Sequence, residues 1–171
     1  MDNLYLLAQY NIWATQQLNK TLRVVSKENF YKDNILFFKS IFATLNHLLV
    51  SEHYLWFSRF STGTSPHLAL NTIIEHNHIK LLDELEHKAK NWITLLSNLS
   101  DEKLKGNLCY TSSQGNQYCV PYSDVLHHVF MHGTHHRGQI TAALTHMGYE
   151  CPEIDLVYML IDRQKNNDYL T

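Results

Sequence analysis

The segment SDVLHHVFMHGTHHRGQITAALTHM, residues 123–147, contains the most informative pattern in this chain of 171 residues. Ser123 and Asp124 can cap a helix here, because their side chains accept hydrogen bonds from unpaired amides and a negative charge suits the positive end of a helix. Gly148 supplies the stop. We therefore expect one long helix that ends at Met147. It carries five of the twelve histidines within ten residues: His127, His128, His132, His135 and His136.

Three of these histidines share one face of the predicted helix. Residues four apart lie one above another, so His128, His132 and His136 form a ladder. Two adjacent rungs can place their imidazoles on a single metal ion. Spacing alone does not choose between the pair His128 and His132 and the pair His132 and His136. The remaining rung would line the site.

A third ligand has to come from another helix, because a catalytic centre with one ion usually has about three protein ligands and an open position. His47 is the available residue. It stands among Leu45, Leu48 and Leu49 near the middle of another predicted helix, where an unpaired imidazole would be costly to bury. His53 lies six residues further on, rotated roughly 240° around an α-helix. We therefore assign His53 a structural role.

Apolar residues at steps of three and four predict three further long helices, over residues 3–25, 38–60 and about 70–99. The polar residues 27–34 are expected to connect the first two. Residues 107–120 hold two β-prone runs around a Ser-Gln-Gly-Asn turn, which predicts a small hairpin. Pro152 and the following residues 153–164 predict a short fifth helix, and we expect residues 166–171 to fray. The length fits a single domain over residues 1–171.

Charge and composition disfavour several classes of protein. Fourteen Lys and Arg against sixteen Asp and Glu give a net charge of -2, so there is no broad basic field for nucleic acid. No uncharged apolar run is long enough for a membrane span, and the start of the chain is too polar for a signal peptide. Three cysteines, an odd number, do not make a disulfide framework. We expect a cytoplasmic protein that binds neither nucleic acid nor membrane.

Two glycines and an arginine inside the histidine helix also carry information. Gly133 and Gly138 each cost roughly 1 kcal/mol of helix propensity relative to alanine, which suggests a close helix crossing. Arg137 points about 100° away from His136, so we expect it to have a structural role.

A di-iron bundle site is the weaker alternative. Glu75-x-x-His78 and Glu84-x-x-His87 both fit the Glu-x-x-His pattern of such sites. The two copies lie nine residues apart on one predicted helix, a rotation of about 180°, so they face opposite sides. Chance placement on a solvated helix explains them better.

The segment His132-Gly-Thr-His-His136-Arg-Gly-Gln139 resembles the signature of the DinB family of DinB/YfiT-like metalloenzymes. Residues 10–14 (YNIWA), residues 44–49 (TLNHLL) with Trp56 and Arg59, and residues 148–160 (GYECPEIDLVYML) resemble three further motifs of that family, in order along the chain. The fold class that the resemblance implies is all-α, an antiparallel four-helix bundle, here with the hairpin insertion and the short C-terminal fifth helix.

The resemblance also implies the site. It places the metal ligands at His47, His132 and His136, and so selects the lower two rungs of the ladder. His128 and Gln139 then become residues that line the site or support a ligand, because Gln139 lies one turn beyond His136 and could orient its ring. The chain departs from many relatives at Glu52-His53, where an acidic residue is followed by Arg or another long side chain. That departure affects the wall of the site.

The implied cofactor is one divalent transition metal, zinc, nickel or iron, since imidazole suits all three. Three neutral imidazoles leave the ion its full charge, which can activate a bound water or thiol. We expect a metal-dependent enzyme, either a thiol-dependent transferase that uses a low-molecular-weight thiol or an enzyme with hydrolase-like chemistry on a small-molecule substrate. The alternative is a stress-associated protein without turnover, whose structural metal has a fourth ligand, His128 or a carboxylate. The resemblance also implies a homodimer.

Overall fold

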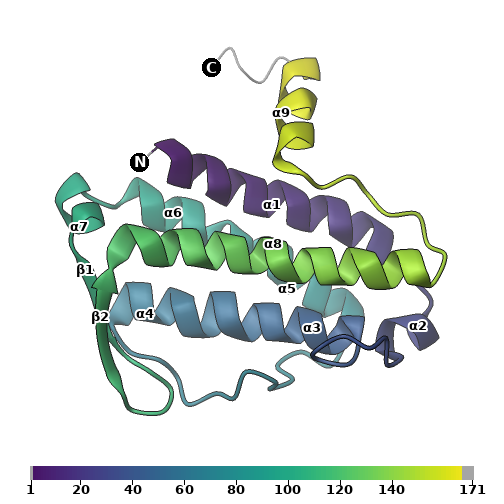
Figure 1. Cartoon of the computed structure of the whole chain (residues 1–171), viewed down its shortest axis with the longest axis horizontal. Coiled ribbons are helices and arrows are strands. Elements are labelled where there is room, and N and C mark those ends of the chain that lie inside the picture. Colours follow the sequence, from purple (N-terminus) through teal and green to yellow (C-terminus); the bar gives the residue numbers. More distant parts are fainter. Residues whose placement is uncertain (1, 167–171) are drawn as a thin grey trace.

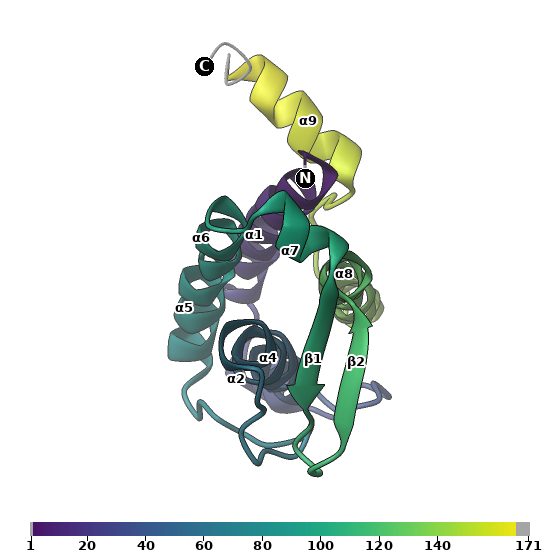
Figure 2. The same cartoon turned by 90° about the vertical axis from the view of Figure 1, so that its left-hand side faces the viewer.

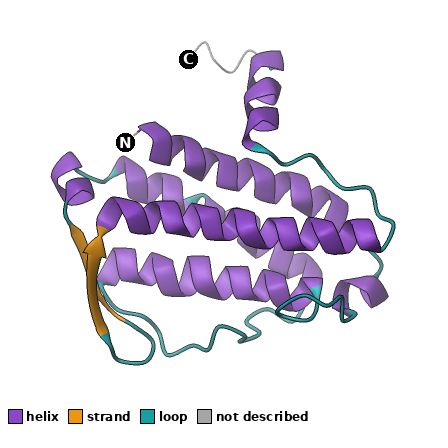
Figure 3. Ribbon diagram, in the orientation of Figure 1, coloured by secondary structure: helices purple, strands orange, loops and turns teal. Residues whose placement is uncertain are grey.

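Four long helical segments make up the bundle of the computed structural model, which describes residues 2–166 (Figure 1). They are α1 (Asp2–Leu22), the continuous run of α3 (Ile41–Leu48), η1 (Leu49–Trp56) and α4 (Phe57–Thr62), the pair α5 (His78–Ala89) and α6 (Asn91–Ser97), and α8 (Tyr122–His146). Helices dominate the ribbon, and a single two-stranded hairpin lies at one end (Figure 3). The four-helix bundle predicted from the sequence is confirmed.

The helices form two parallel pairs that run in opposite directions. At one end of the bundle, Tyr5 near the start of α1 lies 3.3 Å from Ser97 at the end of α6, measured between the two hydroxyl oxygens. The hairpin at the same end contacts α4 through its first strand and leads directly into the start of α8 (Figures 1 and 2). Hence α1 and α8 run one way, and α3–α4 and α5–α6 run the other. The connection over residues 63–77 has to return along the whole bundle.

Two apolar clusters fill the bundle, one on either side of a buried polar layer. The first cluster is built around residues such as Leu45, Leu82 and Ile140, and the second around Trp92 and Phe130. Each fully buried side chain of this size stabilises the fold by about 1.5–3 kcal/mol. The polar layer between them consists of Asn11, Glu52, His53 and Arg137, all at most 8% exposed. Such burial is unfavourable unless the polar atoms are paired.

The second helical segment is not a regular α-helix. Ser40 caps it, and its side chain accepts a hydrogen bond from the amide of Ala43. The segment therefore starts at Ile41, three residues later than predicted. Its middle part, η1, is π-helical, and at its end the amide of Phe57 donates to the carbonyl of Glu52. π-Helical turns are rare and occur often at functional sites.

The predicted third helix is shorter than expected. It begins at His78, because Asn77 caps it by accepting from the amides of Ile79 and Lys80. The preceding residues form an extended connection, in which the side-chain oxygen of Asn46 accepts from the amides of residues 74 and 75. The prediction of a helix from residue 70 is wrong, since this buried asparagine binds the chain in an extended form.

Two short helices were not predicted. The connection over residues 27–34 contains α2 (Lys27–Tyr31), which Ser26 caps. The stretch before the hairpin contains α7 (Asp101–Lys105), which Ser100 caps. Both are too short to show an apolar period. The predicted cap of the histidine helix is wrong as well, because α8 starts at Tyr122 with no side-chain cap. Its predicted stop is confirmed, since Gly148 has a φ of 79°.

The hairpin and the C-terminal helix are confirmed. Strands β1 (Asn107–Thr111) and β2 (Gln117–Pro121) are antiparallel, and Cys109 faces Cys119 in their register. The two cysteines form a disulfide, which the odd number of cysteines did not lead us to expect. The helix α9 (Leu156–Lys165) packs its Met159 against α1. Within residues 2–166, no helix has both the length and the apolar character needed to cross a membrane. Residues 167–171 of the tail expected to fray lie outside the described part.

Candidate metal centre

Three histidines from two facing helices converge on one point. His47 comes from α3, and His132 and His136 come from α8. The Nε2 atom of His132 lies 3.1 Å from the Nε2 atom of His47 and 3.1 Å from that of His136. One nitrogen from each ring lies within 4.8 Å of the others, and within residues 2–166 this is the group that could hold an ion. The structure thus brings together the three residues that the sequence nominates.

The opposite ring nitrogens of two of these histidines are held by hydrogen bonds. Nδ1 of His47 lies 2.9 Å from the carbonyl oxygen of Leu70, and Nδ1 of His136 lies 2.8 Å from Oε1 of Gln139. A carbonyl oxygen only accepts, so Nδ1 is the donor in each ring. The neutral ring then has its lone pair on Nε2, directed at the point of convergence. Gln139 therefore lies where its side chain can orient the His136 ring.

The arrangement fits a divalent transition metal. Three converging nitrogen lone pairs repel one another unless a cation or a proton lies between them. Nitrogen atoms bound about 2.0–2.1 Å from one ion at tetrahedral angles are roughly 3.3 Å apart, close to the observed 3.1 Å. A donor set of three imidazoles is one that zinc, nickel, iron or copper accepts. His47, His132 and His136 would hold the ion.

Burial keeps two of the rings in the form that binds a metal. Desolvation lowers the pKa of His136 to about 4, helped by the nearby His132. Desolvation also lowers the pKa of His47, although its bond to Leu70 acts in the opposite direction. Both rings are therefore neutral at physiological pH, and metal binding there releases no proton from them.

Glu52 lies behind His132 and was not recognised from the sequence as a supporting residue. Its Oε1 atom is 3.8 Å from Nδ1 of His132. Both atoms are buried, and neither has a hydrogen-bond partner among the described residues. A small movement of the His132 ring would let its Nδ1 atom donate a hydrogen bond to Glu52. Each of the three rings would then have an acceptor for its Nδ1 hydrogen. A carboxylate that accepts from a metal-bound histidine fixes the ring and raises its basicity.

The buried polar layer holds Glu52 in place. Nη1 of Arg137 donates to Oδ1 of Asn11 over 2.6 Å, and the Asn11 amide lies 3.5 Å from Oε2 of Glu52. Burial alone would raise the pKa of Glu52, but His132, His53 and the Arg137 cation together hold it below its usual value. Glu52 is therefore ionised. Arg137 has the structural role expected for it.

One of the two glycines of α8 is needed for this layer. A Cβ atom at Gly133 would lie 2.6 Å from Oε1 of Glu52 and 3.0 Å from the side chains of Arg137 and Asn11. The close approach predicted at Gly133 is confirmed. The same prediction for Gly138 is wrong, since no atom lies within 4 Å of a Cβ built there.

Two aromatic contacts form the walls of the centre. The ring of Phe38 stacks on His47, with centroids 3.9 Å apart, and was not predicted as a site residue. The sequence predicts Phe38 as the start of a helix, but it lies in the connection before Ser40, so helical spacing could not place it at the site. His128, the third rung, is exposed and lies outside the group that could hold an ion. Its ring lies 5.9 Å from His132 and 5.4 Å from Trp56, between centroids, so it lies beside the three-histidine cluster.

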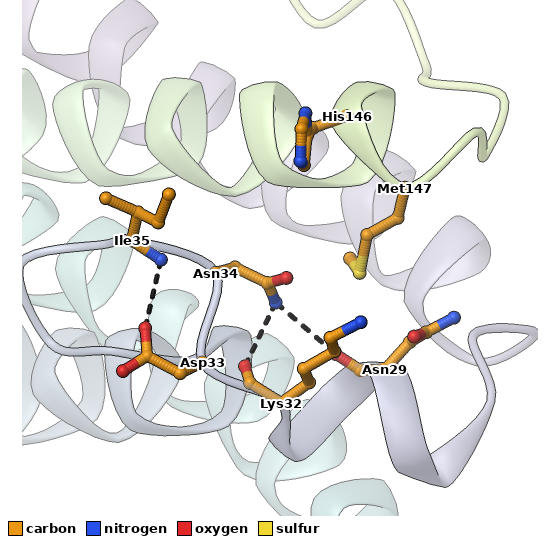
Figure 4. Close-up of a pocket in the computed structure, with 7 residues that line it drawn as sticks. All are labelled: Asn29, Lys32, Asp33, Asn34, Ile35, His146 and Met147. Atoms are coloured by element: carbon orange, nitrogen blue, oxygen red, sulfur yellow. Dashed lines mark hydrogen bonds between the residues drawn. The ribbon is translucent and has the colours of Figure 1, made fainter.

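The connection that carries Phe38 also borders a separate pocket of about 260 Å³ (Figure 4). Asn34 donates there to the carbonyls of Lys32 and Asn29, and the amide of Ile35 donates to Asp33. These bonds fix the path of the chain toward Phe38. None of the three converging histidines lines this pocket. The pocket is therefore separate from the three-histidine cluster.

The predicted alternatives with other ligands receive no support within residues 2–166. Glu75 lies in the extended connection before α5, and His78 packs its ring against Phe30 at 5.1 Å. Neither joins a second group of residues that could hold an ion, nor does a carboxylate join the three histidines.

The bundle and its three converging imidazoles define a class of helical proteins with a candidate centre for one metal ion. Residues 1–166 match the sequence model of the DinB family. Protein DinB of Bacillus subtilis (strain 168) is 32% identical over 160 residues, which cover 90% of this chain and 91% of the relative. The chain belongs to the DinB family.

A solved structure shows the same fold. YfiT from Bacillus subtilis, described as a probable metal-dependent hydrolase with an unusual four-helix bundle topology, matches with a TM-score of 0.68. The match covers 84% of this chain and 87% of YfiT at 15% sequence identity. At that identity the likeness concerns the fold alone.

Proposed function

We propose that this protein is a metal-dependent enzyme in which His47, His132 and His136 hold one divalent transition metal and activate a thiol or a water molecule. The observation that carries the proposal is the convergence of three Nε2 atoms, two of them on rings whose Nδ1 atoms are held by hydrogen bonds. The description of YfiT as a probable metal-dependent hydrolase is in line with it. Thiol-dependent transfer is the reaction to test first, with hydrolysis as the second.

The surroundings of the histidines suit a catalytic centre. Three protein ligands leave a coordination position open, and a divalent ion there would lower the pKa of a bound thiol or water toward neutrality. The His132 side chain is 18% exposed, so small molecules have access from its side. Phe38 covers His47 and excludes water from the opposite side. Ionised Glu52 would compensate one positive charge and favour release of an anionic product.

The test is turnover by metal-replete protein with a low-molecular-weight thiol and an electrophilic substrate. We expect turnover that depends on both metal and thiol, and its loss in His132→Ala, because that substitution removes the ligand central to the cluster. A parallel assay with ester substrates and no thiol tests hydrolysis. Absence of both activities in protein with one bound metal would reject the enzymatic proposal.

The same metal-replete protein also shows whether the metal is catalytic or structural, through the effect of metal removal on thermal stability. A chelator should remove a catalytic ion with a modest loss of thermal stability, because the bundle has two apolar clusters of its own. If removal of the metal unfolds the protein and no turnover is found, the metal is structural, as in the alternative of a stress-associated binding protein.

The homodimer implied by family resemblance also stays a proposal. Exposed apolar side chains on α9, Val157 and Ile161, are available for contact with a second copy. Light scattering after size-exclusion chromatography gives the mass in solution. A monomer mass at micromolar concentration would reject it.

A further inference from the structure

Arg59 differs from the other arginines because, among residues 2–166, neither of its terminal amino groups has a hydrogen-bond partner. Arg23 pairs with Asp83, Arg137 donates to Asn11, and Arg163 donates to Gln9. Arg59 uses only its Nε atom, which donates to Oγ of Ser65 over 2.7 Å. No carboxylate of residues 2–166 forms an ion pair with it. Its two terminal nitrogens have no hydrogen-bond partner among the described residues and are not buried, so they reach the solvent.

The Arg59 guanidinium is nevertheless held in a fixed orientation. Its central carbon lies 4.2 Å from the centroid of a Trp56 ring and 4.7 Å from that of Tyr110. A cation above an aromatic face is attracted by the ring, and a partly desolvated one more strongly. Together with Ser65, the two rings fix the plane of the group. The free amino groups are therefore presented without the entropic cost that a mobile surface arginine would have.

The same aromatic wall connects Arg59 to the candidate metal centre. Trp56 contacts the ring of His128, and His128 contacts the ring of His132. The Arg59 cation is near enough to His128 to lower its pKa, in addition to the larger effect of burial. Because α8 rises about 6 Å over four residues, Arg59 and the three Nε2 atoms are separated by on the order of 10 Å along the seam between the helices.

We propose that Arg59 binds the carboxylate of a small substrate whose reacting atom lies at the three histidines. A guanidinium with two free amino groups matches a carboxylate through two parallel hydrogen bonds. One unpaired cation balances one negative charge, which favours a monoanionic carboxylate over a phosphate dianion. The inference rests on the proposed function and adds the substrate class to it: a carboxylic acid of about six carbons, with its thiol or electrophilic group at the far end.

The test compares two thiols of equal length on cobalt-substituted protein, mercaptohexanoic acid and mercaptohexanol. Binding of either sulfur to the ion is followed by the thiolate-to-cobalt charge-transfer absorption, together with the cobalt stoichiometry. We expect the acid to bind about tenfold more tightly than the alcohol, the usual size of a charge-assisted hydrogen-bonded pair at a partly exposed site.

Variants of the arginine assign that preference. Arg59→Gln should abolish it while the affinity for the alcohol stays within about twofold, and Arg59→Lys should retain only part of it, since an ammonium group cannot form the paired bonds. Arg23→Gln removes an equal charge from an exposed site and should keep the preference. Equal binding of acid and alcohol to wild type, or a preference that survives in Arg59→Gln, would overturn the inference.

A second measurement separates this inference from the proposed function. If neither thiol perturbs the cobalt spectrum, the proposed function fails at the metal. The carboxylate site is then measured by NMR, through the shift of the Arg59 side-chain Nε–H resonance on addition of hexanoate, with hexanol as the control. A shift with hexanoate alone supports the carboxylate site, and no shift with either rejects it. Titration with inorganic phosphate tests the other oxyanion, and stronger binding of phosphate than hexanoate would also reject the assignment.

Discussion

Two helical segments face each other across the three histidines, and they build the site in different ways. On one side α8 is a regular α-helix, and intervals of four residues place His128, His132 and His136 in a row. On the other side η1 is π-helical, with hydrogen bonds from residue i to residue i+5. Glu52 follows His47 by five residues, and in an α-helix the two would be roughly 140° apart. Yet both face α8.

The difference shows how ligands and supporting groups are encoded. Metal ligands on a regular helix can be found from spacing, because their interval equals the helical period. The carboxylate behind His132 cannot, because its placement depends on a local change in helical hydrogen bonding. The regular side should therefore determine whether metal binds, and the π-helical side how tightly.

The largest expected effect comes from the ladder on α8. His136→Ala should remove the metal completely, whereas His128→Ala should keep one ion per chain, because the His128 ring lies outside the ligand group. Elemental analysis of the two purified variants beside wild type measures this directly. Stoichiometric metal in His136→Ala, or its loss in His128→Ala, would mean that the ladder uses its other pair of rungs.

The next effect concerns the π-helical side. Glu52→Gln keeps the shape of the side chain but removes the charge that faces His132, and should weaken metal binding about 10- to 100-fold. Competition with a chromophoric chelator gives the affinity. Glu28→Gln, at an exposed position on α2, serves as the control for the loss of one negative charge. Equal affinities in the two variants would contradict a supporting role for Glu52.

The sequence predicted the fold well where a period extends over several turns. The four long segments, the hairpin and α9 follow from apolar spacing and turn residues. It failed where a single side chain redirects the backbone. Asn46 binds two amides of the extended connection, and nothing in the apolar period over residues 70–77 reveals that distant partner. The short helices α2 and α7 depend on local serine caps in the same way.

The candidate site divides along the same line. His47 was nominated because an imidazole among leucines needs a partner, and Gln139 because it lies one turn from His136. Phe38 was missed because it lies in a connection. Glu52 was assigned to the wall of the site, but its position behind His132 was missed because of the π-helix. Family resemblance was needed to choose His136 over His128, since both are one turn from His132.

A smaller effect, opposite in sign at two positions, tests how tightly the two sides pack. Gly133→Ala adds a methyl group against Glu52, Asn11 and Arg137. Overpacking of this kind costs about 1–3 kcal/mol, partly offset by the gain of about 1 kcal/mol in helix propensity. Gly138→Ala meets no atom and should stabilise the protein by up to about 1 kcal/mol. Urea denaturation measures both, and the same sign for both variants would contradict the close crossing at Gly133.

A last prediction concerns the pH dependence of the metal-free protein and compares one buried histidine from each side. Burial lowers the pKa of His136 on α8 and of His53 on η1 to about 4, from an ordinary value of 6.5. Between these values the unfolded chain binds more protons than the folded one, so the free energy of unfolding should fall as the pH decreases from 6.5 to about 4. His136→Gln and His53→Gln should each reduce that slope by up to one proton.

Added zinc then separates the two histidines. If zinc binds the neutral ring of His136 as proposed, it should raise the urea midpoint of His53→Gln at pH values above 6.5. This stabilisation should be lost on acidification, because protons compete for the ligands. His136→Gln lacks a ligand and should show little change with zinc. Urea titrations of both variants at three pH values, with and without zinc, give the four slopes of unfolding free energy against pH. An equal response of the two variants to zinc would place the metal elsewhere than on α8.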